Sequence, residues 1–257
     1  MPEWSAAQYL KFADQRTRPA ADLLARVARD APARAIDLGC GPGNSTALLA
    51  ARWPRAHLAG LDNAPDMLAT ARRAHPAIEW ITADLVTWQP PKRDAERYDV
   101  VFSNAALQWV PDHERLFPRL LDAVAPGGAF AVQMPRAAGK AQSVIREIAA
   151  DGPWAAKLAG RDRAQVHPPS VYYELLARRV RRIDLWETEY HQVMESTAAI
   201  AEWLKGSGLR SFLPLLSDDE RTQFLARYQA EIDAAYPAQT DGRVIFPFRR
   251  LFMVCEV

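Results

Sequence analysis

Residues 37–46 read Asp-Leu-Gly-Cys-Gly-Pro-Gly-Asn-Ser-Thr, and this stretch decides the fold. It follows a short apolar run, residues 35–38, and precedes a helical pattern, so we expect it at the first strand-to-helix turn of an α/β sheet. Glycines at three alternate positions, Gly39, Gly41 and Gly43, predict backbone that approaches a ligand closely, because a Cβ there would collide with it. In a doubly wound sheet this turn lies beside the point where the strand order reverses, which is where nucleotide-like ligands bind.

The spacing of these glycines separates two classes of ligand. A dinucleotide-binding fingerprint reads G-x-G-x-x-G, and its third glycine would fall at position 44, where this chain has Asn44. The G-x-G-x-G form found here resembles class I S-adenosylmethionine-dependent methyltransferases. A plain tight turn would also explain a glycine triplet on its own, so the prediction depends on further residues.

Two acidic residues at later strand ends support a cofactor site. Asp62 ends the second expected strand, about 20 residues after the last glycine, where a carboxylate can accept both hydroxyls of a ribose. Asp84 follows the third expected strand, where a carboxylate can accept hydrogens from an adenine amino group. Either acid alone is equally typical of a turn or a helix cap. Signals at three successive strand ends favour one shared site.

The pattern of short apolar runs and amphipathic helical stretches continues beyond this region, which predicts a mostly parallel sheet with helices on both faces. About fifty residues of helical pattern separate the last two strands, too many for a hairpin loop. We therefore expect a seven-stranded, Rossmann-like α/β fold with a helical lid inserted before the last strand. The expected strands are residues 35–38, 57–61, 79–82, 98–102, 129–133, 183–193 and 244–257. The expected parts of one domain, residues 1–257, are an N-terminal helical segment (1–33), a core (34–193 and 244–257) and the lid (194–243).

Composition and charge exclude several classes of protein. Of the 257 residues, 49% are hydrophobic and 25% are charged, which is typical of a globular chain and excludes a fibrous or disordered one. The 32 basic and 31 acidic side chains give a formal net charge of +1, so no overall field attracts nucleic acid or an anionic membrane. No stretch reaches the roughly 18 apolar residues of a membrane span, and the N-terminus shows no secretory pattern. We expect a cytoplasmic protein.

Metal chemistry and nucleic-acid binding are not expected. The two cysteines, Cys40 and Cys255, match no zinc or redox spacing, and the five histidines are scattered. Cysteines so far apart suit a reducing compartment without disulfides. Residues 178–182, Arg-Arg-Val-Arg-Arg, suggest a contact with nucleic acid, but no stacking aromatic side chains are interleaved with them. The preferred interpretation of this basic run is a solvated helix end that leads into a strand.

A more specific resemblance rests on segments along nearly the whole chain. They are Tyr9-Leu10, Arg16 with Arg18-Pro19-Ala20, residues 37–49, Asn104-Ala105, Leu107-Gln108-Trp109, Pro111-Asp112-His113, residues 131–135, Tyr190-His191-Gln192, Gly208-Leu209-Arg210 and Arg250-Leu251-Phe252. With these segments the chain resembles the trans-aconitate methyltransferases, which esterify one carboxylate of a small tricarboxylic acid. It departs from their pattern at residues 178–182, where relatives tend to have a glycine-containing turn, and at Phe248-Arg249, where a proline can precede the arginine.

This resemblance implies the cofactor and its surroundings. It implies S-adenosylmethionine as the methyl donor, S-adenosylhomocysteine as its product, and no metal. Asp37 would orient the amino group of the cofactor, and the chain around Asn104 would run beside its methionine part. The cofactor-binding residues expected are Asp37, Gly39, Cys40, Gly41, Gly43, Asn44, Asp62, Asn63, Met67, Asp84, Leu85, Asn104 and Ala105.

The resemblance also implies a small polycarboxylic acid as the acceptor, with no nucleic-acid or membrane partner. A carboxylate, with a solution pKa near 4, is already ionised at pH 7, so its methylation needs no strong general base. Arginines suit such an acceptor because the planar guanidinium binds a carboxylate through two hydrogen bonds. The acceptor-binding residues expected are Arg16, Arg18, Gln108, Trp109, Tyr190, His191, Arg210 and Arg250. His191 is the one candidate base, with a structural role at a strand edge as the alternative, and Trp109 either lines the pocket or joins the core.

Two other functions stay open at this point. One is a methyltransferase that acts on a macromolecule or a larger natural product, and the other is a cofactor-binding module without catalytic activity. The size of a methylated product separates the first of these from a small-acid methyltransferase. A protein of the second kind would bind the cofactor and label nothing.

Overall fold

Seven strands form one mixed sheet in a computed structural model that describes residues 13–136, 139–161 and 166–257, the first four of these by their backbone alone. The strands are β1 (Arg34–Leu38), β2 (His57–Asp62), β3 (Glu79–Thr82), β4 (Tyr98–Asn104), β5 (Val124–Pro135), β6 (Arg182–Met194) and β7 (Val244–Glu256). Their order in the sheet is β3-β2-β1-β4-β5-β7-β6. This order and the seven strands confirm the predicted fold class. The glycine turn lies directly after β1, at the point where the strand order reverses.

The strands β1 to β5 run parallel to their neighbours, whereas β7 runs antiparallel to β5. The direction of β7 follows from two backbone hydrogen bonds. Val257 donates to the carbonyl of Gly128, and Arg136 donates to the carbonyl of Arg249, so residue numbers rise along one strand as they fall along the other. A parallel sheet with one antiparallel strand near its edge is a common arrangement.

The described residues divide into two compact units. The core unit consists of residues 13–134, 166–187 and 251–257, and the helical unit consists of residues 135–136, 139–161 and 188–250. The strands β5, β6 and β7 each contribute residues to both. The expected insertion, residues 194–243, lies inside the helical unit, which in addition takes in the segment after β5.

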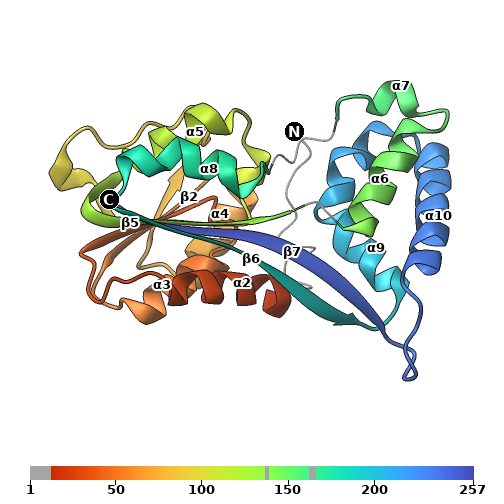
Figure 1. Cartoon of the computed structure of the whole chain (residues 1–257), viewed down its shortest axis with the longest axis horizontal. Coiled ribbons are helices and arrows are strands. Elements are labelled where there is room, and N and C mark those ends of the chain that lie inside the picture. Colours follow the sequence, from red (N-terminus) through yellow and green to blue (C-terminus); the bar gives the residue numbers. More distant parts are fainter. Residues whose placement is uncertain (1–12, 137–138, 162–165) are drawn as a thin grey trace. The chain divides into compact units, whose positions relative to one another are not determined.

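Helices cover both faces of the sheet in the core unit. They are α2 (Ala13–Ala25), α3 (Asn44–Arg52), α4 (Pro65–Ala74), α5 (His113–Leu121) and α8 (Pro169–Leu176), with short 3-10 helices η1 (Asp94–Glu96), η2 (Leu107–Trp109) and η3 (Ala177–Arg179). In Figure 1, α2 and α3 lie on one face and α5 and α8 on the other. As its spacing predicts, α4 begins at Pro65 and buries Met67, Leu68 and Ala71. Burial of such an apolar side chain stabilises the fold by about 1.5–3 kcal/mol.

The start of β5 differs from the expected one. The spacing places Pro126-Gly127-Gly128 at the end of a helix, just before a strand that begins at residue 129. In the structure the strand begins at Val124, and the three residues lie within it. A register shift between β4 and β5 at Tyr98 accommodates the proline, and Gly127 has a φ of 73° that favours glycine.

The helical unit contains α6 (Lys140–Ala150), α7 (Ala155–Leu158), α9 (Thr197–Lys205) and α10 (Asp218–Ala235), with the 3-10 helices η4 (Gly208–Ser211) and η5 (Leu213–Leu215). Helix α10 packs against α6 and α9 and buries Phe224, Tyr228 and Ile232, which are spaced four residues apart. Helix α6 was not expected, because a Gly-, Ala- and Pro-bearing stretch leads into it. Its signal was present nonetheless, in buried residues at helical spacing such as Val144, Ile145 and Ile148.

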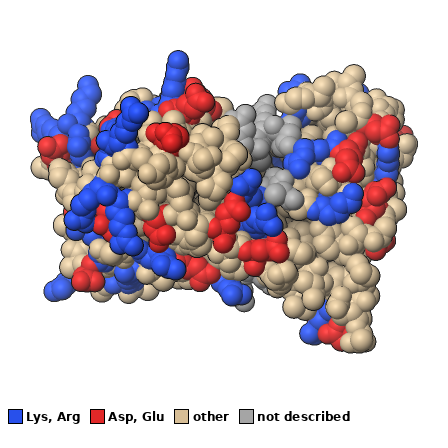
Figure 2. Space-filling model, viewed as in Figure 1, with Lys and Arg blue, Asp and Glu red and all other residues tan. Residues whose placement is uncertain are grey.

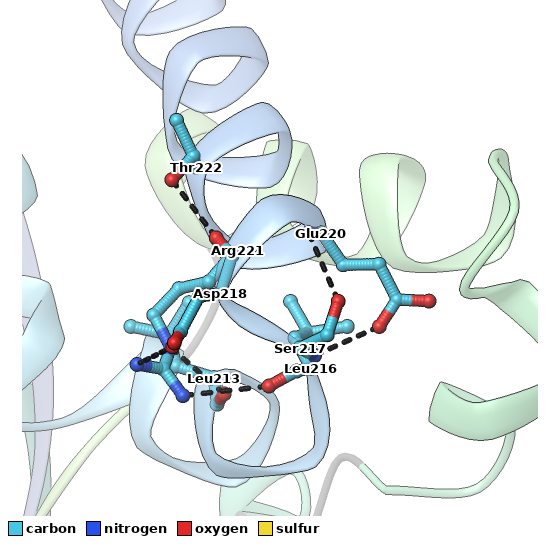
Figure 3. Close-up of polar contacts among 7 residues, drawn as sticks. All are labelled: Leu213, Leu216, Ser217, Asp218, Glu220, Arg221 and Thr222. Atoms are coloured by element: carbon cyan, nitrogen blue, oxygen red, sulfur yellow. Dashed lines mark hydrogen bonds and ion pairs between the residues drawn. The ribbon is translucent and has the colours of Figure 1, made fainter.

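The start of α10 shows why that helix begins where it does (Figure 3). Ser217 accepts a hydrogen bond from the Glu220 amide at 3.3 Å, and the Glu220 carboxylate accepts one from the Ser217 amide at 2.8 Å. This capping box satisfies two amides that the helix itself leaves unpaired. Arg221 donates to the carbonyls of Leu213 and Leu216, so the same helical turn also holds the preceding loop.

The basic run at residues 178–182 forms the end of η3 and the start of β6, as predicted. Arg179 donates to the Pro118 carbonyl at 2.8 Å and pairs with Asp122. Arg181 and Arg182 both pair with Glu256, at 2.5 and 3.5 Å. Acidic and basic side chains are likewise intermixed over the face shown in Figure 2. Within the described ranges, every helix is too short or too polar to span a lipid bilayer.

Candidate functional site

The glycine turn connects β1 to α3 and lies against the ends of the two strands that flank β1. The amides of Gly39 and Cys40 both donate to the Leu61 carbonyl at the end of β2, at 2.7 and 3.0 Å. Gly39 has a φ of 71°, and a Cβ at this position would collide with the Cβ of Ala106. Gly41 has a φ of 53°, and apart from its chain neighbours no heavy atom of the described residues lies within 4 Å of where its Cβ would be.

The glycines therefore serve different purposes. We expected all three to allow close approach of a ligand. In the structure, Gly39 packs against the segment after β4. Gly43 packs against the Trp80 ring, whose nearest atom would lie 3.0 Å from an added Cβ. Of the three, Gly41 alone has free space beside it among the described residues. A ligand at this turn would approach the backbone at Gly41.

Asp62 joins the glycine turn to the start of α4. One carboxylate oxygen accepts from the Gly41 amide at 2.8 Å, and the other accepts from the Ala64 amide at 2.9 Å. The second bond is an Asx turn, the ordinary structural role of an aspartate at a strand end. The first bond spans 21 positions and holds the glycine turn in shape.

Replacing Asp62 with alanine is expected to weaken binding of an adenosyl cofactor by roughly 1 to 3 kcal/mol, because charge-assisted hydrogen bonds to the ligand and to Gly41 are both lost. Calorimetric titration measures the affinity, and amide hydrogen exchange at Gly41 reports the freed turn. Asp66→Ala is the matched control, since it removes an exposed carboxylate from the first turn of α4. Equal affinities for folded Asp62→Ala and Asp66→Ala proteins would remove Asp62 from the site.

Asp37 is fully buried in the middle of the sheet, next to the turn. Its Oδ2 accepts hydrogen bonds from the hydroxyls of Ser45 and Thr46, both at 2.7 Å, while its buried Oδ1 has no hydrogen-bond partner among the described residues. The pKa of Asp37 is raised to about 6, because burial and, to a smaller extent, the nearby Asp62 raise it by more than the two hydroxyl hydrogen bonds lower it. An acceptor oxygen buried without a donor is costly unless a ligand supplies the donor.

The end of β4 completes this edge of the sheet. Ser103 donates through its hydroxyl to the Leu38 carbonyl at 2.8 Å, which ties β4 to the end of β1. Asn104 follows, and within the part of the chain that the structure describes its buried side-chain oxygen has no hydrogen-bond partner. Ala105 then adopts a φ of 55°, a left-handed conformation that is rare for a residue other than glycine. Strained backbone of this kind clusters at functional sites.

Asp84 makes the turn that follows β3. Its carboxylate accepts from the Val86 amide at 2.8 Å, which is the Asx-turn role that we weighed against ligand binding. The turn is held from α5, where Arg119 donates to the carbonyls of Leu85 and Val86 at 2.6 and 2.8 Å. The support from Arg119 was not predicted, because nothing in the sequence links the two segments.

For the other expected cofactor residues, the structure gives their burial and their place in the fold. Cys40 is buried, and burial raises the pKa of its thiol, so it is not a reactive thiolate. Met67 and Leu85 are buried apolar residues, while Asn44 begins α3 and Asn63 is exposed. Their roles toward a cofactor stay predictions.

Gln108 and Trp109 lie in η2, three and four positions after the strained Ala105. The Gln108 side chain is buried and donates to the Ala105 carbonyl at 2.8 Å, while its own oxygen has no hydrogen-bond partner in residues 13–136, 139–161 and 166–257. Trp109 is half-buried, so it neither joins the core fully nor lies open to solvent. These two residues, with Asp37, Gly41, Asp62 and Asn104, are gathered at the carboxyl edge of the core unit.

The remaining acceptor candidates belong mostly to the helical unit and are described within it. Tyr190 is buried, whereas the neighbouring His191 is 62% exposed and lies 3.6 Å from the Glu189 carboxylate. Arg250 is only 4% exposed and stacks over the Phe248 ring, with its guanidinium carbon 4.8 Å from the ring centre. Arg210, in η4, is half-buried.

Two acceptor candidates, Arg16 and Arg18, belong to helix α2 near the N-terminus. Arg18, in α2, is exposed and lies 4.0 Å from Asp22. The side chain of Arg16 lies outside the described residues, as do Tyr9 and Leu10.

Two features near the site were missed by sequence reasoning. One is the pair of hydroxyls on Asp37, and the other is a buried histidine, His113, bonded to Tyr172. Hydroxyl residues directly after a glycine turn are a usable signal for the first. The second joins residues 59 positions apart, and no local pattern reveals it. In the described part of the chain, no group of three or more His, Cys, Asp or Glu side chains is placed to hold a metal ion.

Comparisons with known proteins agree with this geometry. A family model described as a methyltransferase domain matches residues 35–128. Over its full length the chain is similar to the trans-aconitate 2-methyltransferase of Azoarcus sp. (strain BH72), with 52% identity over 256 residues that cover 99% of each chain. It is 48% identical to the protein of that name from Methylobacterium radiotolerans over 262 residues, which cover 100% of this chain and 99% of the relative.

Solved structures share the fold at low sequence identity. A putative methyltransferase from Bacillus halodurans C-125 superposes with a TM-score of 0.59 and 12% identity, covering 93% of this chain and 98% of that one. The phosphoethanolamine N-methyltransferase 2 of Haemonchus contortus, in complex with S-adenosyl-L-methionine, gives a TM-score of 0.56 with 17% identity over 93% of this chain and 52% of that one. At such identities the likeness concerns the fold.

Proposed function

Because the chain belongs to the trans-aconitate 2-methyltransferase family, we propose that it transfers a methyl group from S-adenosylmethionine to one carboxylate of trans-aconitate. The observation that carries this proposal is the sequence identity of 52% and 48% to two trans-aconitate 2-methyltransferases, which extends over 99% and 100% of this chain. It includes the helical unit, and not only the segments that many methyltransferases share. S-adenosylmethionine-dependent methyl transfer is the activity of the family, and the acceptor is the proposed part.

The carboxyl edge of the core unit fits the cofactor. The buried Oδ1 of Asp37 suits the ammonium group, and the open space at Gly41 suits a ligand close to the backbone. Each oxygen of a carboxylate has two acceptor sites, so Asp62 can bind ribose hydroxyls together with backbone amides. Asp84 would bind the adenine amino group, and Asn104 the methionine part. When bound, the cofactor supplies a methyl group on a positively charged sulfur.

The residues of the chain would contribute orientation and exclusion of water rather than proton transfer. The acceptor carboxylate is ionised at neutral pH, so it already has the electron pair that forms the new bond. Gln108 and Trp109, in η2, would border the reacting groups. Alignment of two reactants in a closed site can by itself supply much of a rate enhancement.

Acceptor recognition is proposed for arginines, with Arg250 and Arg210 in the helical unit and Arg16 and Arg18 in α2. Arg250 is the strongest of these, because its buried guanidinium is held over the Phe248 ring and has the planar fork that binds a carboxylate through two hydrogen bonds. Tyr190, in β6, is buried in the helical unit as well. The proposed role of the helical unit is that of a lid that contributes these side chains.

The alternative acceptors are less well supported. A macromolecular substrate would need an extended docking surface, and the basic run at residues 178–182 is engaged with Asp122 and Glu256 of the same unit. A binding module without activity would not need the segment of residues 104–109, with its left-handed Ala105, held in a strained form beside the cofactor.

Steady-state kinetics with a panel of acids tests the proposal. The purified protein is incubated with labelled S-adenosylmethionine and trans-aconitate, cis-aconitate, isocitrate or citrate, and in parallel with a cell extract. We expect trans-aconitate to give the highest kcat/KM and the extract to yield a small labelled acid. A labelled product of macromolecular size would indicate the larger acceptor, and cofactor binding without any label would indicate a binding module.

The pH profile should show no essential base. At saturating cofactor, kcat/KM for the acid is expected to be nearly constant from about pH 6 to 8, because no group must lose a proton before the carboxylate reacts. The exposed position of His191, whose side chain is 62% exposed, supports this expectation. An ionisation near pH 6.5 that is present in the native enzyme and absent from His191→Asn would instead make His191 the base.

A further inference from the structure

The segment between β4 and α5, residues 105–112, has an unusual backbone. It begins with Ala105 at a φ of 55° and ends with Asp112 at a φ of 56°, and the 3-10 helix η2 lies between them. Each left-handed residue other than glycine costs about 1–2 kcal/mol, so contacts from outside the segment must hold it in this form. The segment contains Gln108 and Trp109, which border the proposed reaction site.

His113 supplies one such contact from the first position of α5. Its ring is 1% exposed, with Nε2 2.9 Å from the Leu107 carbonyl oxygen and Nδ1 2.8 Å from the Tyr172 hydroxyl. A carbonyl oxygen can only accept, so Nε2 carries the hydrogen. In a neutral ring Nδ1 is then an acceptor, and the Tyr172 hydroxyl must donate to it.

The surroundings of His113 favour the neutral ring. Burial lowers its pKa, although the carbonyls of Leu107 and Val110 and the carboxylate of Asp112 act against this, and the nearby His167 ring lowers it further. The Tyr172 oxygen in turn accepts from the His167 amide at 3.1 Å. A directed chain of three hydrogen bonds therefore runs from His167 through Tyr172 and His113 to the Leu107 carbonyl.

We propose that His113 and Tyr172 are positioning residues that fix η2, and with it Gln108 and Trp109, in the shape that methyl transfer requires. Neither side chain is assigned a contact with a reacting atom, and both act through Leu107. The Gln108 side chain closes the other end of the turn by donating to the Ala105 carbonyl. The effect on catalysis rests on the proposed function, whereas the effect on the segment itself does not.

Tyr172→Phe tests the proposal with little change in packing, because the ring stays beside Phe117, 4.7 Å from it between ring centres. We expect kcat to fall about tenfold, since a displacement of about 1 Å at a reaction site costs up to 100-fold. We expect the Kd for S-adenosylhomocysteine to change less than threefold, because Asp37 and Asp62 are unaffected. Amide exchange at Trp109 and Val110, whose hydrogen bonds close η2, should become at least tenfold faster.

Tyr228→Phe is the matched control. Tyr228 is also fully buried and donates to a backbone carbonyl, that of Ala141 at 3.2 Å, but it belongs to the helical unit. The Tyr228→Phe protein should lose about as much stability as the Tyr172→Phe protein. Its kcat and the amide exchange at Trp109 and Val110 should be those of the native protein. Nitrogen NMR of the native protein should show His113 protonated at Nε2 alone.

The outcomes separate the two proposals. Unchanged exchange at Trp109 and Val110 in Tyr172→Phe, or an equal loss of kcat in Tyr228→Phe, would overturn the positioning role. Faster exchange confined to η2 together with the expected His113 tautomer would support it even if native protein left trans-aconitate unmethylated, and that last result would overturn the proposed function alone.

Discussion

Replacing Arg250 with alanine is expected to lower kcat/KM for trans-aconitate by about tenfold to a few hundredfold, which corresponds to one lost charge-assisted hydrogen bond of about 1.5 to 3 kcal/mol. Arg250 lies in β7 and is 4% exposed, with its guanidinium over the Phe248 ring. A guanidinium fixed by stacking needs little reordering to bind a carboxylate. The affinity for S-adenosylmethionine should barely change. Steady-state kinetics and calorimetry on the same protein sample measure both quantities.

Arg249→Ala is the internal control for this prediction. Strand alternation turns Arg249 away from Arg250, and the structure shows it exposed and 3.3 Å from Glu189. An exposed ion pair contributes at most about 1 kcal/mol, so the variant should be nearly silent. Arg250→Lys should recover only part of the activity, because it restores the charge without the planar fork. If folded, cofactor-binding Arg250→Ala protein kept full activity, Arg250 would have no part in acceptor binding.

Asp37→Asn is expected to weaken S-adenosylmethionine binding about 10- to 150-fold, by about 1.5 to 3 kcal/mol, because the ammonium group loses its only proposed charged partner. The native protein should show the same effect on acidification. Since the pKa of Asp37 is raised to about 6, the carboxylate becomes protonated below that pH, and affinity should fall about tenfold for each further pH unit. In Asp37→Asn the affinity should not change over this range. Calorimetry from pH 5 to 8 measures both proteins.

The same carboxylate predicts how stability without ligand depends on pH. Between pH 3.8 and about 6 the folded state binds a proton at Asp37 that the unfolded chain has released. The free energy of unfolding therefore falls as pH rises through this interval, by about 3 kcal/mol for this group. Urea unfolding should show this component in native protein and not in Asp37→Asn. Its presence in both would assign it to another group.

Local sequence patterns predicted the fold well, because the strands, turns and helices of the core unit follow the hydrophobic and glycine spacing of the sequence. The glycine turn, the acids at the ends of β2 and β3, and the apolar row of α4 are each readable within a few residues. Helix α6 was missed although its apolar residues have helical spacing, because a Gly- and Pro-bearing stretch in front of it obscured the pattern. The early start of β5 depends on its pairing with β4 and β7, and pairing partners are not a local property.

The sequence predicted which strand ends meet at the candidate site but not the contacts that their residues make, and the roles of these residues toward a ligand stay predictions. Asp62 was expected to bind ribose, and the structure adds that it holds the glycine turn through Gly41. Gly39 was expected to face a ligand, and it instead makes room for Ala106. Both contacts join segments brought together by the sheet. The chain of hydrogen bonds through His113 and Tyr172 is of the same kind, since α5 and α8 meet only in the folded protein.

The identity of the methylated product tests the central claim most directly. Purified protein is incubated with trans-aconitate and S-adenosylmethionine labelled with carbon-13 in its methyl group, and the product is examined by two-dimensional carbon–proton NMR. We expect one labelled methyl group whose protons correlate with a single carboxyl carbon of trans-aconitate, as in a monomethyl ester. A labelled methyl group attached to nitrogen, sulfur or protein, or cofactor binding with trans-aconitate left unmethylated, would contradict it.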